Sequence, residues 1–265
     1  MASELLDRQM VAAPAADLER RFGGLRRLYG EEGYARIRAA RIAIVGVGGV
    51  GSWAAEALAR SGVAALTLID LDHVAESNIN RQVQAVGATI GQAKVQALRV
   101  RIADIHPDCE VTCIEEFVDA DNWPTLLRNP VDAVIDACDQ VRAKLAISAW
   151  ALRTGTATFI AGAAGGKRLA HAVRVVDLGQ VTHDPLLAAL RQRLRKQHGG
   201  ARTGKIGLRC VYSPEPVATP DDACAAGAAA DGSLNCHGYG SSVGVTATFG
   251  LVAAGLALEC CAARK

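Results

Sequence analysis

The chain has 265 residues, of which half are apolar and about a fifth are charged, and its formal net charge is +2. This composition is ordinary for a soluble globular protein, and the length allows one large domain or two small ones. The eight cysteines include no pair with the C-x-x-C spacing of a zinc ribbon. A chain of this size needs no disulfides, so we expect reduced thiols, no zinc and a cytoplasmic location. The N-terminal segment mixes acids and bases without a long apolar stretch, so we expect no signal peptide.

The first two thirds of the chain alternate between apolar strands and segments of helical period. Strands are predicted at 41–46, 65–70, 109–117, 131–137 and 157–162. Helices are predicted between them, at 49–61, about 91–105 and 141–154. This β-α-β alternation is typical of an α/β, Rossmann-like fold with a mostly parallel sheet and helices on both faces.

The last third is less regular. A helix at 184–196, capped by Asp184, is predicted between strands at 171–178 and 204–213. Residues 218–233 are low in complexity and are predicted to form a loop. We expect an N-terminal extension over 1–19 and a single domain over 20–265, because no linker divides the chain.

The C-terminal segment predicts an apolar helix at about 242–262. No charged residue occurs from Gly232 through Leu258, so this segment passes as a membrane span by composition. A fully buried helix of an α/β protein has the same composition, and the rest of the chain favours that interpretation. Membrane association of this segment is the alternative.

A glycine-rich turn joins the first strand to the first helix in "RIAIVGVGGVGSW". Gly46, Gly48, Gly49 and Gly51 leave the backbone N–H groups of the helix start free to approach phosphate oxygens. Asp70 ends the next strand, where a carboxylate accepts hydrogen bonds from ribose hydroxyls. The pattern fits a dinucleotide cofactor as well as ATP.

The residues after Asp70 favour ATP. The stretch "IDLDHVAESNINRQ" and the following "GQAK" bring polar and basic side chains next to the ribose carboxylate: Asp72, Asn78, Arg81, Gln82 and Lys94. An arginine and a lysine at the phosphate end have no role in hydride transfer. They suit a triphosphate whose charge must be neutralised while pyrophosphate leaves.

Two carboxylates, Asp136 and Asp139, follow the strand at 131–137 in "DACD". The carboxyl edge of a parallel sheet is a suitable place for a carboxylate that holds Mg²⁺ against phosphates. Asp139 as an ordinary helix cap is the alternative.

These motifs, in this order, resemble the adenylation domain of the ubiquitin-activating-enzyme-like (ThiF/MoeB/HesA) superfamily. The resemblance implies that a carboxylate attacks the α-phosphate of ATP to give an acyl-adenylate and pyrophosphate. It also implies site roles: Asp70 binds ribose, and Asn78, Arg81 and Lys94 contact the phosphates. Asp72 is counted with the ATP-binding residues, and Asp139 holds magnesium.

The resemblance further implies a homodimer in which an N-terminal arginine reaches into the partner's site. That arginine is expected within "RRFGGLRRLYG", at 20–30. Arg21 is the first choice and Arg27 the alternative.

Within the superfamily the sequence is most similar to the tRNA threonylcarbamoyladenosine dehydratase branch. The similarity runs through "RFGGLRRLYG", "AGAAGGK", "HDPLLAALRQRLRK", "VYSPE" and "VTATFG". It implies that ATP activates the carboxylate of threonylcarbamoyladenosine in tRNA, beside the anticodon, for ring closure. An activator of a sulfur-carrier or ubiquitin-like protein is the alternative, although the two C-x-x-C pairs that such activators often carry are absent. A nicotinamide-dependent dehydrogenase is a second rival.

A basic segment at about 184–215 supports a nucleic-acid partner. No acid occurs between Asp184 and Glu215, but seven bases do: Arg191, Arg193, Arg195, Lys196, Arg202, Lys205 and Arg209. A segment of this kind is suited to contact tRNA phosphates without reading the sequence. Lys167 and Arg168 are expected to extend it toward the site.

Cys236 lies in "NCHGYGSS", where relatives keep a reactive thiol for sulfur or thioester transfer. A small buried cysteine is the simpler interpretation, because the dehydration needs no covalent thiol. The resemblance leaves open a base role for His237 and a sulfur-relay partner of the cysteine-desulfurase type.

Overall fold

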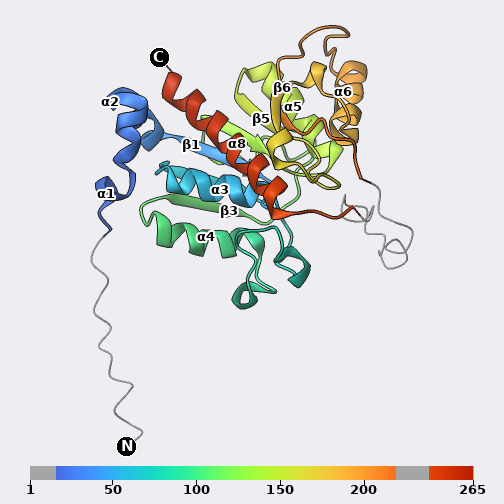
Figure 1. Cartoon of the computed structure of the whole chain (residues 1–265). Helices are drawn as coiled ribbons and strands as arrows, with labels where there is room; N and C mark the ends of the chain where they lie inside the picture. The colour runs from blue at the N-terminus through green and yellow to red at the C-terminus, as the bar shows by residue number, and fades with distance from the viewer. Residues whose placement is uncertain (1–15, 219–238, 265) are drawn as a thin grey trace, which may run out of the picture.

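The computed structural model describes residues 16–218 and 239–264 (Figure 1). The strands are β1 Arg41–Val45, β2 Ala65–Ile69, β3 Glu110–Ile114, β4 Ala133–Asp136, β5 Ala157–Ala161, β6 Arg174–Asp177 and β7 Arg209–Tyr212. The α-helices are α1 Leu18–Phe22, α2 Gly24–Ala39, α3 Gly51–Arg60, α4 Lys94–Ile105, α5 Val141–Thr154, α6 Pro185–Gln197 and α8 Val243–Ala263. The 3₁₀ turns are η1 Glu76–Asn78, η2 Gly87–Thr89, η3 Ala170–Ala172 and η4 Leu178–Gln180.

One sheet of seven strands, in the order β3-β2-β1-β4-β5-β7-β6, forms the centre of the molecule. Only β6 runs antiparallel to its neighbour, so the predicted mostly parallel sheet is confirmed. The strand order reverses at β1, which lies between β2 and β4. The connections after β1 and β4 therefore diverge to opposite faces, and the crevice they leave is where open α/β sheets bind ligands.

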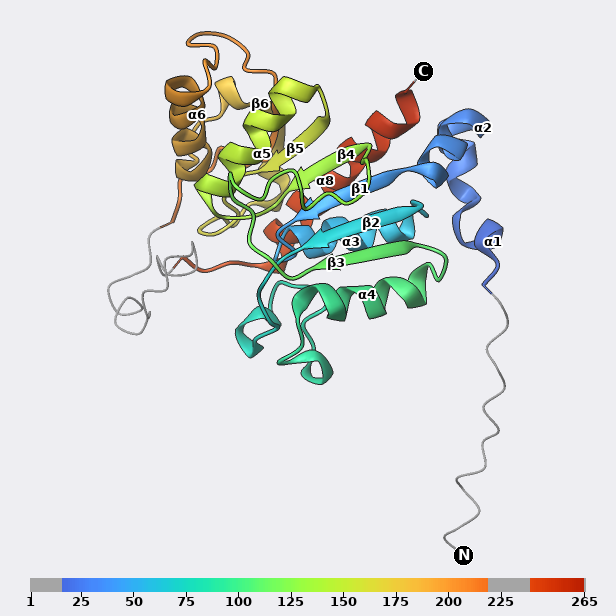
Figure 2. The same cartoon turned by 180° about the vertical axis from the view of Figure 1, so that it is seen from behind.

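Alternation along β1 shows how the sheet is covered on both faces. Ile42 and Ile44 face a core shared with α3, α4 and α8. Ala43 and Val45 face a second core shared with α5. In Figure 1 α8 and α3 lie in front of the sheet, and the view from behind in Figure 2 shows β1, β2 and β3 in front of them. The predicted Rossmann-like arrangement is confirmed.

Helix α8 is the predicted C-terminal apolar helix, and it packs into the fold. Phe249, Ala253 and Ala257 are fully buried, and the helix contacts α2, α3 and three strands. Gly250 allows this close approach, because a Cβ there would lie 2.3 Å from the carbonyl oxygen of Val50. The helix is long and apolar enough to cross a membrane, but half of its most apolar window is buried inside the protein. Burial in the core explains the composition of its inner face.

The predicted helix at 184–196 is confirmed as α6. Asp184 caps it, with Oδ1 accepting a hydrogen bond from the N–H of Leu187 at 3.0 Å, and Pro185 occupies the first turn. The strand predicted at 204–213 is shorter and covers only β7. Two helices, α1 and α2, were not predicted, because charged residues and glycines interrupt their sequence and leave no clear apolar stripe. Most of the loop predicted at 218–233 lies outside the described residues.

Candidate functional site

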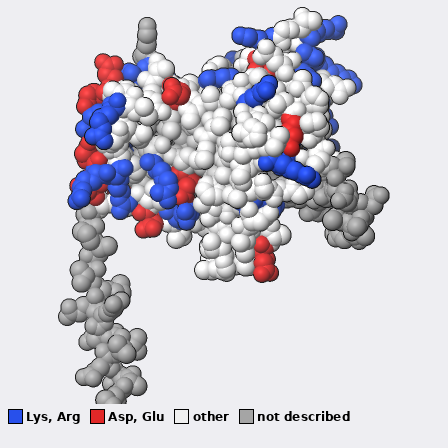
Figure 3. All heavy atoms as spheres, viewed as in Figure 1, with Lys and Arg blue, Asp and Glu red and all other residues white. Residues whose placement is uncertain are grey.

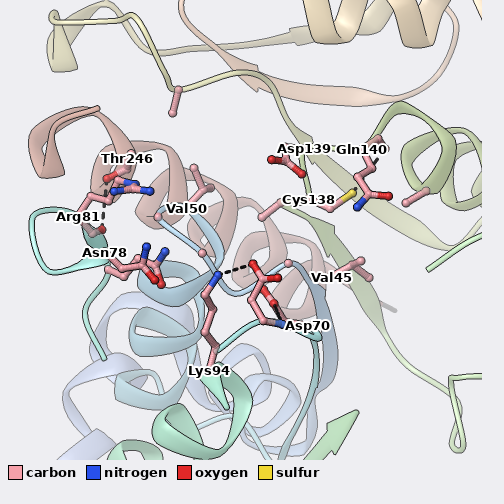
Figure 4. A pocket seen from close by; sticks show the side chains of 18 of the residues that line it. Val45, Val50, Asp70, Asn78, Arg81, Lys94, Cys138, Asp139, Gln140 and Thr246 are labelled. Carbon is pink, nitrogen blue, oxygen red and sulfur yellow. Dashed lines mark hydrogen bonds and ion pairs between the residues drawn. The ribbon is translucent and has the colours of Figure 1, made fainter. Parts of the chain in front are cut away.

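A cleft of about 1020 Å³ opens at the carboxyl ends of the central strands. Its walls come from the glycine turn after β1, the segment around η1, the turn between β4 and α5, and the segment after β5. Figure 4 shows side chains from these elements pointing into one space. The topology explains this, because all parallel strands of the sheet end at the same edge.

The four glycines of the turn have different roles. Gly46 has a φ of +81°, and a Cβ there would lie 2.8 Å from the backbone of Cys138. A Cβ at Gly51 would lie 1.8 Å from the carbonyl oxygen of Gly46. Gly48 and Gly49 line the cleft as Gly46 does, and a Cβ at Gly48 would meet no protein atom closer than 3.8 Å, whereas a Cβ at Gly49 would lie 3.2 Å from Thr246 Cγ2. Gly46 and Gly51 therefore build the turn, Gly49 allows Thr246 to pack closely against it, and Gly48 leaves room for a ligand to reach the backbone.

Asp70 is held against the glycine turn at the end of β2. Its Oδ2 accepts a hydrogen bond from the N–H of Val47 at 2.7 Å, and its Oδ1 accepts one from the N–H of Asp72 at 2.9 Å. Burial raises the pKa of Asp70 and outweighs the opposing effect of the nearby Lys94 charge. Each oxygen keeps a further lone pair that can accept from a hydroxyl group.

Lys94 begins α4 with a side chain that is almost fully buried. Its Nζ donates to Asp72 Oδ2 at 2.6 Å, although the Asp72 side chain is 57% exposed. Lys94 also lines the cleft, and in the view of Figure 4 its ammonium group enters from the lower side, next to Asp70. An exposed carboxylate is a weak competitor, so the ammonium remains available to an anion.

Asn78 and Arg81 approach the cleft from the segment around η1. Asn78 is buried and its Oδ1 accepts from the N–H of Ala75, which fixes the turn. The Arg81 guanidinium donates to the carbonyl oxygen of Ser77 and to Asn80 Oδ1, and burial lowers its pKa. Within the described residues no carboxylate pairs with Arg81. A half-buried guanidinium without a counterion is suited to bind an anionic ligand.

The two aspartates of "DACD" have different environments. Asp136 is fully buried and pairs with the equally buried Lys144, with Nζ 3.0 Å from Oδ1. Cys138 donates its S–H to the same oxygen, and burial raises the pKa of this thiol, which is therefore neutral. Asp139 is exposed in the cleft. Of the two carboxylates, only Asp139 is available to a ligand.

A metal ion in this cleft would take most of its ligands from the bound molecule. Across 16–218 and 239–264, no three His, Cys, Asp or Glu side chains lie close enough together to hold one. Magnesium commonly uses one or two carboxylates together with phosphate oxygens, and the single free carboxylate of Asp139 fits that pattern.

Several lining residues were missed from the sequence. Glu116, Phe117 and Val118 follow β3 and form an outer wall of the cleft. Phe117 is an exposed aromatic side chain, 51% accessible. Thr246 enters from α8 at the opposite end of the chain. The position of 116–118 directly after a predicted parallel strand is a signal that could have identified them.

Two of the residues that were predicted to contact tRNA donate hydrogen bonds to backbone carbonyl oxygens of the protein itself. Lys167 is 2% exposed, and its Nζ donates to the carbonyl oxygens of His183, Ser213 and Glu215. Arg191 donates to the carbonyl oxygens of Leu178 and Val181. The surface role predicted for Lys167 is therefore wrong. Arg191 is partly buried, and its hydrogen bonds connect α6 to η4 and the residue that follows it.

The remaining basic residues of this segment form an accessible group. We call it the basic surface: Arg193, Arg195, Lys196, Arg202, Lys205 and Arg209. Blue side chains gather at the upper right of Figure 3, toward the α6 side of the molecule, with few red ones among them. No ion pair joins any member of the basic surface to an acid in the described part of the chain.

The N-terminal arginines differ in how they are bound. Arg21 donates to the carbonyl oxygens of Asp104 and Ile105, at the C-terminus of α4, and does not line the cleft. Arg27 is exposed, and no hydrogen bond from it to another described residue is seen. Arg27 is therefore the more available of the two. The roles predicted for Cys236 and His237, and with them the sulfur-relay partner, concern positions outside the described residues.

Comparison with known proteins places the chain in a family. The model of the ThiF family matches residues 22–263. A protein of Escherichia coli (strain K12) named tRNA threonylcarbamoyladenosine dehydratase is 43% identical over 247 residues, which cover 90% of this chain and 92% of the relative. The crystal structure of E. coli tRNA N6-threonylcarbamoyladenosine dehydratase, TcdA, in complex with ATP matches with a TM-score of 0.83 at 41% identity, covering 92% of this chain and 95% of that one. The complex with AMP matches with a TM-score of 0.82 at 40% identity, covering 94% and 97%.

Proposed function

The chain belongs to the ThiF family, and on that premise we propose that it is an ATP-dependent tRNA threonylcarbamoyladenosine dehydratase. The observation that carries the proposal is the cleft itself. It combines a glycine turn that is open at Gly48, the Arg81 guanidinium, which has no carboxylate partner among the described residues, and Lys94, which pairs there with an exposed carboxylate. This set of groups suits a triphosphate, and relatives named for the activity are similar over nearly the whole chain.

The reaction has two steps that balance without a redox partner. In the first step the carboxylate of the threonylcarbamoyl group attacks the α-phosphorus of ATP. An oxygen–phosphorus bond forms, the bond to the β-phosphate oxygen breaks, and pyrophosphate leaves. In the second step a nucleophile of the same side chain attacks the activated carbonyl carbon, loses its proton and displaces AMP. The modified nucleobase loses the elements of one water overall. The oxygen that it loses comes from the carboxylate and departs in AMP.

Different cleft residues are proposed to bind the ribose, the base and the phosphates of ATP. Asp70 accepts from the ribose hydroxyls, while Phe117 and Val118 offer an apolar wall at the base end. Arg81 and Lys94 neutralise phosphate charge as it develops, together with the N–H groups of the glycine turn. Asn78 holds the turn that carries Arg81.

Asp139 is the residue that would hold magnesium. It is the free carboxylate at the end of β4, whereas Asp136 is fully buried, does not line the cleft and pairs with Lys144 through Oδ1. When bound, magnesium supplies charge neutralisation on the phosphates and orients them. Asp139→Asn should raise the magnesium concentration needed for AMP formation, and the apparent affinity for magnesium measured by titration should fall with it.

The basic surface is proposed to receive the tRNA. Its members carry no counterion from the described part of the chain and lie on the side of the molecule where α6 borders the cleft through Leu186. Phosphate contacts of this kind hold the nucleic acid without reading its sequence.

A homodimer is proposed, in which Arg27 reaches the partner's cleft. Leu28, beside Arg27, is 73% exposed, and Leu251 on the outer face of α8 is 50% exposed. Burial of such side chains against a second copy is favourable. Mixing Arg27→Ala with Lys94→Ala tests the arrangement, because half of the sites in the mixed dimer would then contain neither change. Restored AMP formation is expected on mixing, and none would contradict a shared site.

The test of the function is AMP release from the full chain with Mg-ATP, with and without tRNA that bears threonylcarbamoyladenosine. AMP formation together with a mass loss of one water from the modified nucleoside is the expected result. AMP formation without that loss would point to a different carboxylate, such as the tail of a small carrier protein. No AMP under any condition, with NAD binding instead, would overturn the adenylation assignment.

A further inference from the structure

Two neighbouring glutamines, Gln82 and Gln84, lie at the end of the cleft where the phosphates are proposed to bind. Gln82 is 6% exposed and lines the cleft, and Gln84 is 2% exposed and lies behind it. The Nε2 of Gln84 donates to two oxygens at 3.0 Å: the carbonyl oxygen of Val47, within the glycine turn, and Oε1 of Gln82. Gln84 thus joins the glycine turn to the segment that carries Arg81.

These hydrogen bonds determine which way each amide points. The carbonyl oxygen of Val47 can only accept, so the NH₂ group of Gln84 must face it. The same NH₂ group meets Gln82, so the atom of Gln82 at that position must be the oxygen. The NH₂ group of Gln82 is therefore turned the other way. It lies over Gly48, where a Cβ would be 3.8 Å from Gln82 Nε2.

The N–H donors of Gln82 have no acceptor among the residues that the structure describes. They belong to a side chain that lines the cleft beside Gly48, where the backbone is open to the cleft. Phosphate oxygens only accept hydrogen bonds, so the orientation of this amide decides whether it attracts or repels a phosphate. A reversed amide would present its oxygen to the anion.

A glutamine at position 84 lowers the stability of the folded protein unless its N–H donors are needed. Its Oε1 is buried without a hydrogen-bond partner among the described residues. A buried, unpartnered oxygen destabilises a protein, and leucine or methionine would fill the same volume without that cost. What glutamine supplies here is one NH₂ group with two donors, and both are used on oxygens that set the geometry of the phosphate end.

We propose that Gln84 is a positioning residue that holds the Gln82 amide with its N–H donors toward the phosphates of ATP. This inference rests on the proposed binding of ATP in the cleft. Gln84 itself does not line the cleft, so it acts on the nucleotide only through Gln82 and the Val47 carbonyl.

The test compares ATP with adenosine, which lacks the phosphates, in calorimetric titrations of the full chain. Gln84→Met should weaken ATP binding by about tenfold, the size expected for one hydrogen bond to a charged group, and should leave adenosine binding unchanged. Gln92→Met is the matched control. Gln92 also donates through Nε2 to a backbone carbonyl, that of Ala88, but it is exposed and lies outside the cleft.

A double-mutant cycle isolates the route of the effect. In a Gln82→Met background, Gln84→Met should cause little further loss of ATP affinity. Gln82→Glu keeps the oxygen that accepts from Gln84 but replaces the NH₂ group by an anionic oxygen. It should weaken ATP binding more than Gln84→Met does and spare adenosine. If Gln84→Met does not fold, Gln84→Leu takes its place in the cycle.

The outcomes separate the inference from the proposed function. Equal losses for ATP and adenosine would show that Gln84 is merely structural and would overturn the inference. Unchanged ATP affinity in Gln84→Met, or additive losses in the double variant, would also overturn it. Failure of the unmodified chain to bind ATP would instead overturn the proposed function.

Discussion

The two ends of the sheet carry their charges in opposite ways. Around α2, α3 and α4, five arginines are paired with glutamates of the same chain: Arg26 with Glu19 and Glu31, Arg36 with Glu32, Arg41 with Glu110, and Arg60 and Arg101 with Glu56. Arg27 and Arg99 have no such partner among the described residues. The basic surface at the other end has no such partners within the described residues. Figure 3 shows the contrast, with blue and red interleaved at the left and blue nearly alone at the upper right.

This difference indicates which charges serve the fold and which face outward. An arginine paired within the chain contributes to stability, whereas a cluster of like charges repels itself and favours an external polyanion. The cleft combines both patterns. Lys94 is paired but with an exposed carboxylate, and Arg81 has no carboxylate partner in the described part of the chain.

The largest effect is expected at Lys94, and it tests whether this pairing is structural. Lys94→Met should lower the rate of AMP formation by about 10²–10³, the usual size for loss of one preorganised charge in an active site. The melting temperature should change little, because an ion pair to an exposed carboxylate contributes little to stability. Rates of AMP release and a thermal melt measure the two quantities. A large loss of stability with normal turnover would assign Lys94 to the fold.

Arg128→Met is the control for Lys94. Arg128 is an exposed cation outside the cleft, so its removal should leave both quantities unchanged.

The second largest effect is expected for tRNA binding by the basic surface. Replacing Arg193, Lys196 and Arg202 together by glutamine should weaken tRNA binding by about tenfold or more at moderate salt. The slope of log affinity against log salt should become shallower by about one for each phosphate that the protein no longer neutralises. Filter binding over a series of salt concentrations measures both. Unchanged affinity would exclude this face as the tRNA site.

A matched triple variant elsewhere separates local binding from net charge. Arg20, Arg99 and Arg128 are exposed and lie outside the basic surface. Their replacement by glutamine changes the net charge equally, and it should weaken tRNA binding much less.

The sequence predicted the sheet and its ligand edge well, because both depend on local patterns. Each apolar run from 41 to 162 became a strand or a helix close to its predicted bounds. The glycine turn and Asp70 came together at β1 and β2, since parallel strands end at one edge. Asp184 capped α6 as its residue type and position indicated.

The predictions that were wrong or missing concern interactions between residues far apart in the chain, which a local sequence pattern does not contain. Lys167 lies in a basic stretch of the sequence, but carbonyl oxygens near β7 and α6 surround its ammonium group. Arg191 has the same spacing as Arg193 and Arg195, yet it points back to η4. Gln84 was not singled out, because its role depends on Val47, which is 37 residues away in the chain.

A smaller effect is expected from breaking the most buried pairing of the first region. Glu56 is 5% exposed and accepts hydrogen bonds from Arg60 and Arg101. Glu56→Gln should lower the free energy of unfolding by about 1–2 kcal/mol, because it loses charged hydrogen bonds while the two half-exposed arginines regain water. Urea unfolding measures this. ATP turnover per folded molecule should not change.

Glu110→Gln sharpens the same comparison on the surface. Glu110 pairs with Arg41, but its side chain is 56% exposed. The free energy of unfolding should fall much less than in Glu56→Gln, because solvent screens an exposed ion pair. An equal loss in both variants would mean that burial does not decide the value of these pairs.

The smallest effect is a pH dependence that assigns the Glu56 contribution to its charge. Burial raises the pKa of Glu56, but hydrogen bonds from Arg101 and Arg60 outweigh it, so that the pKa lies below its ordinary value of 4.5. A lowered pKa in the folded state means that the stabilisation is present above pH 4.5 and is lost as the pH falls through the folded value. The difference in unfolding free energy between the unmodified chain and Glu56→Gln should therefore be constant near neutral pH and shrink on acidification. Urea unfolding at a series of pH values measures it, and a difference that stays constant into acid would show that Glu56 stabilises α3 by packing and not by its charge.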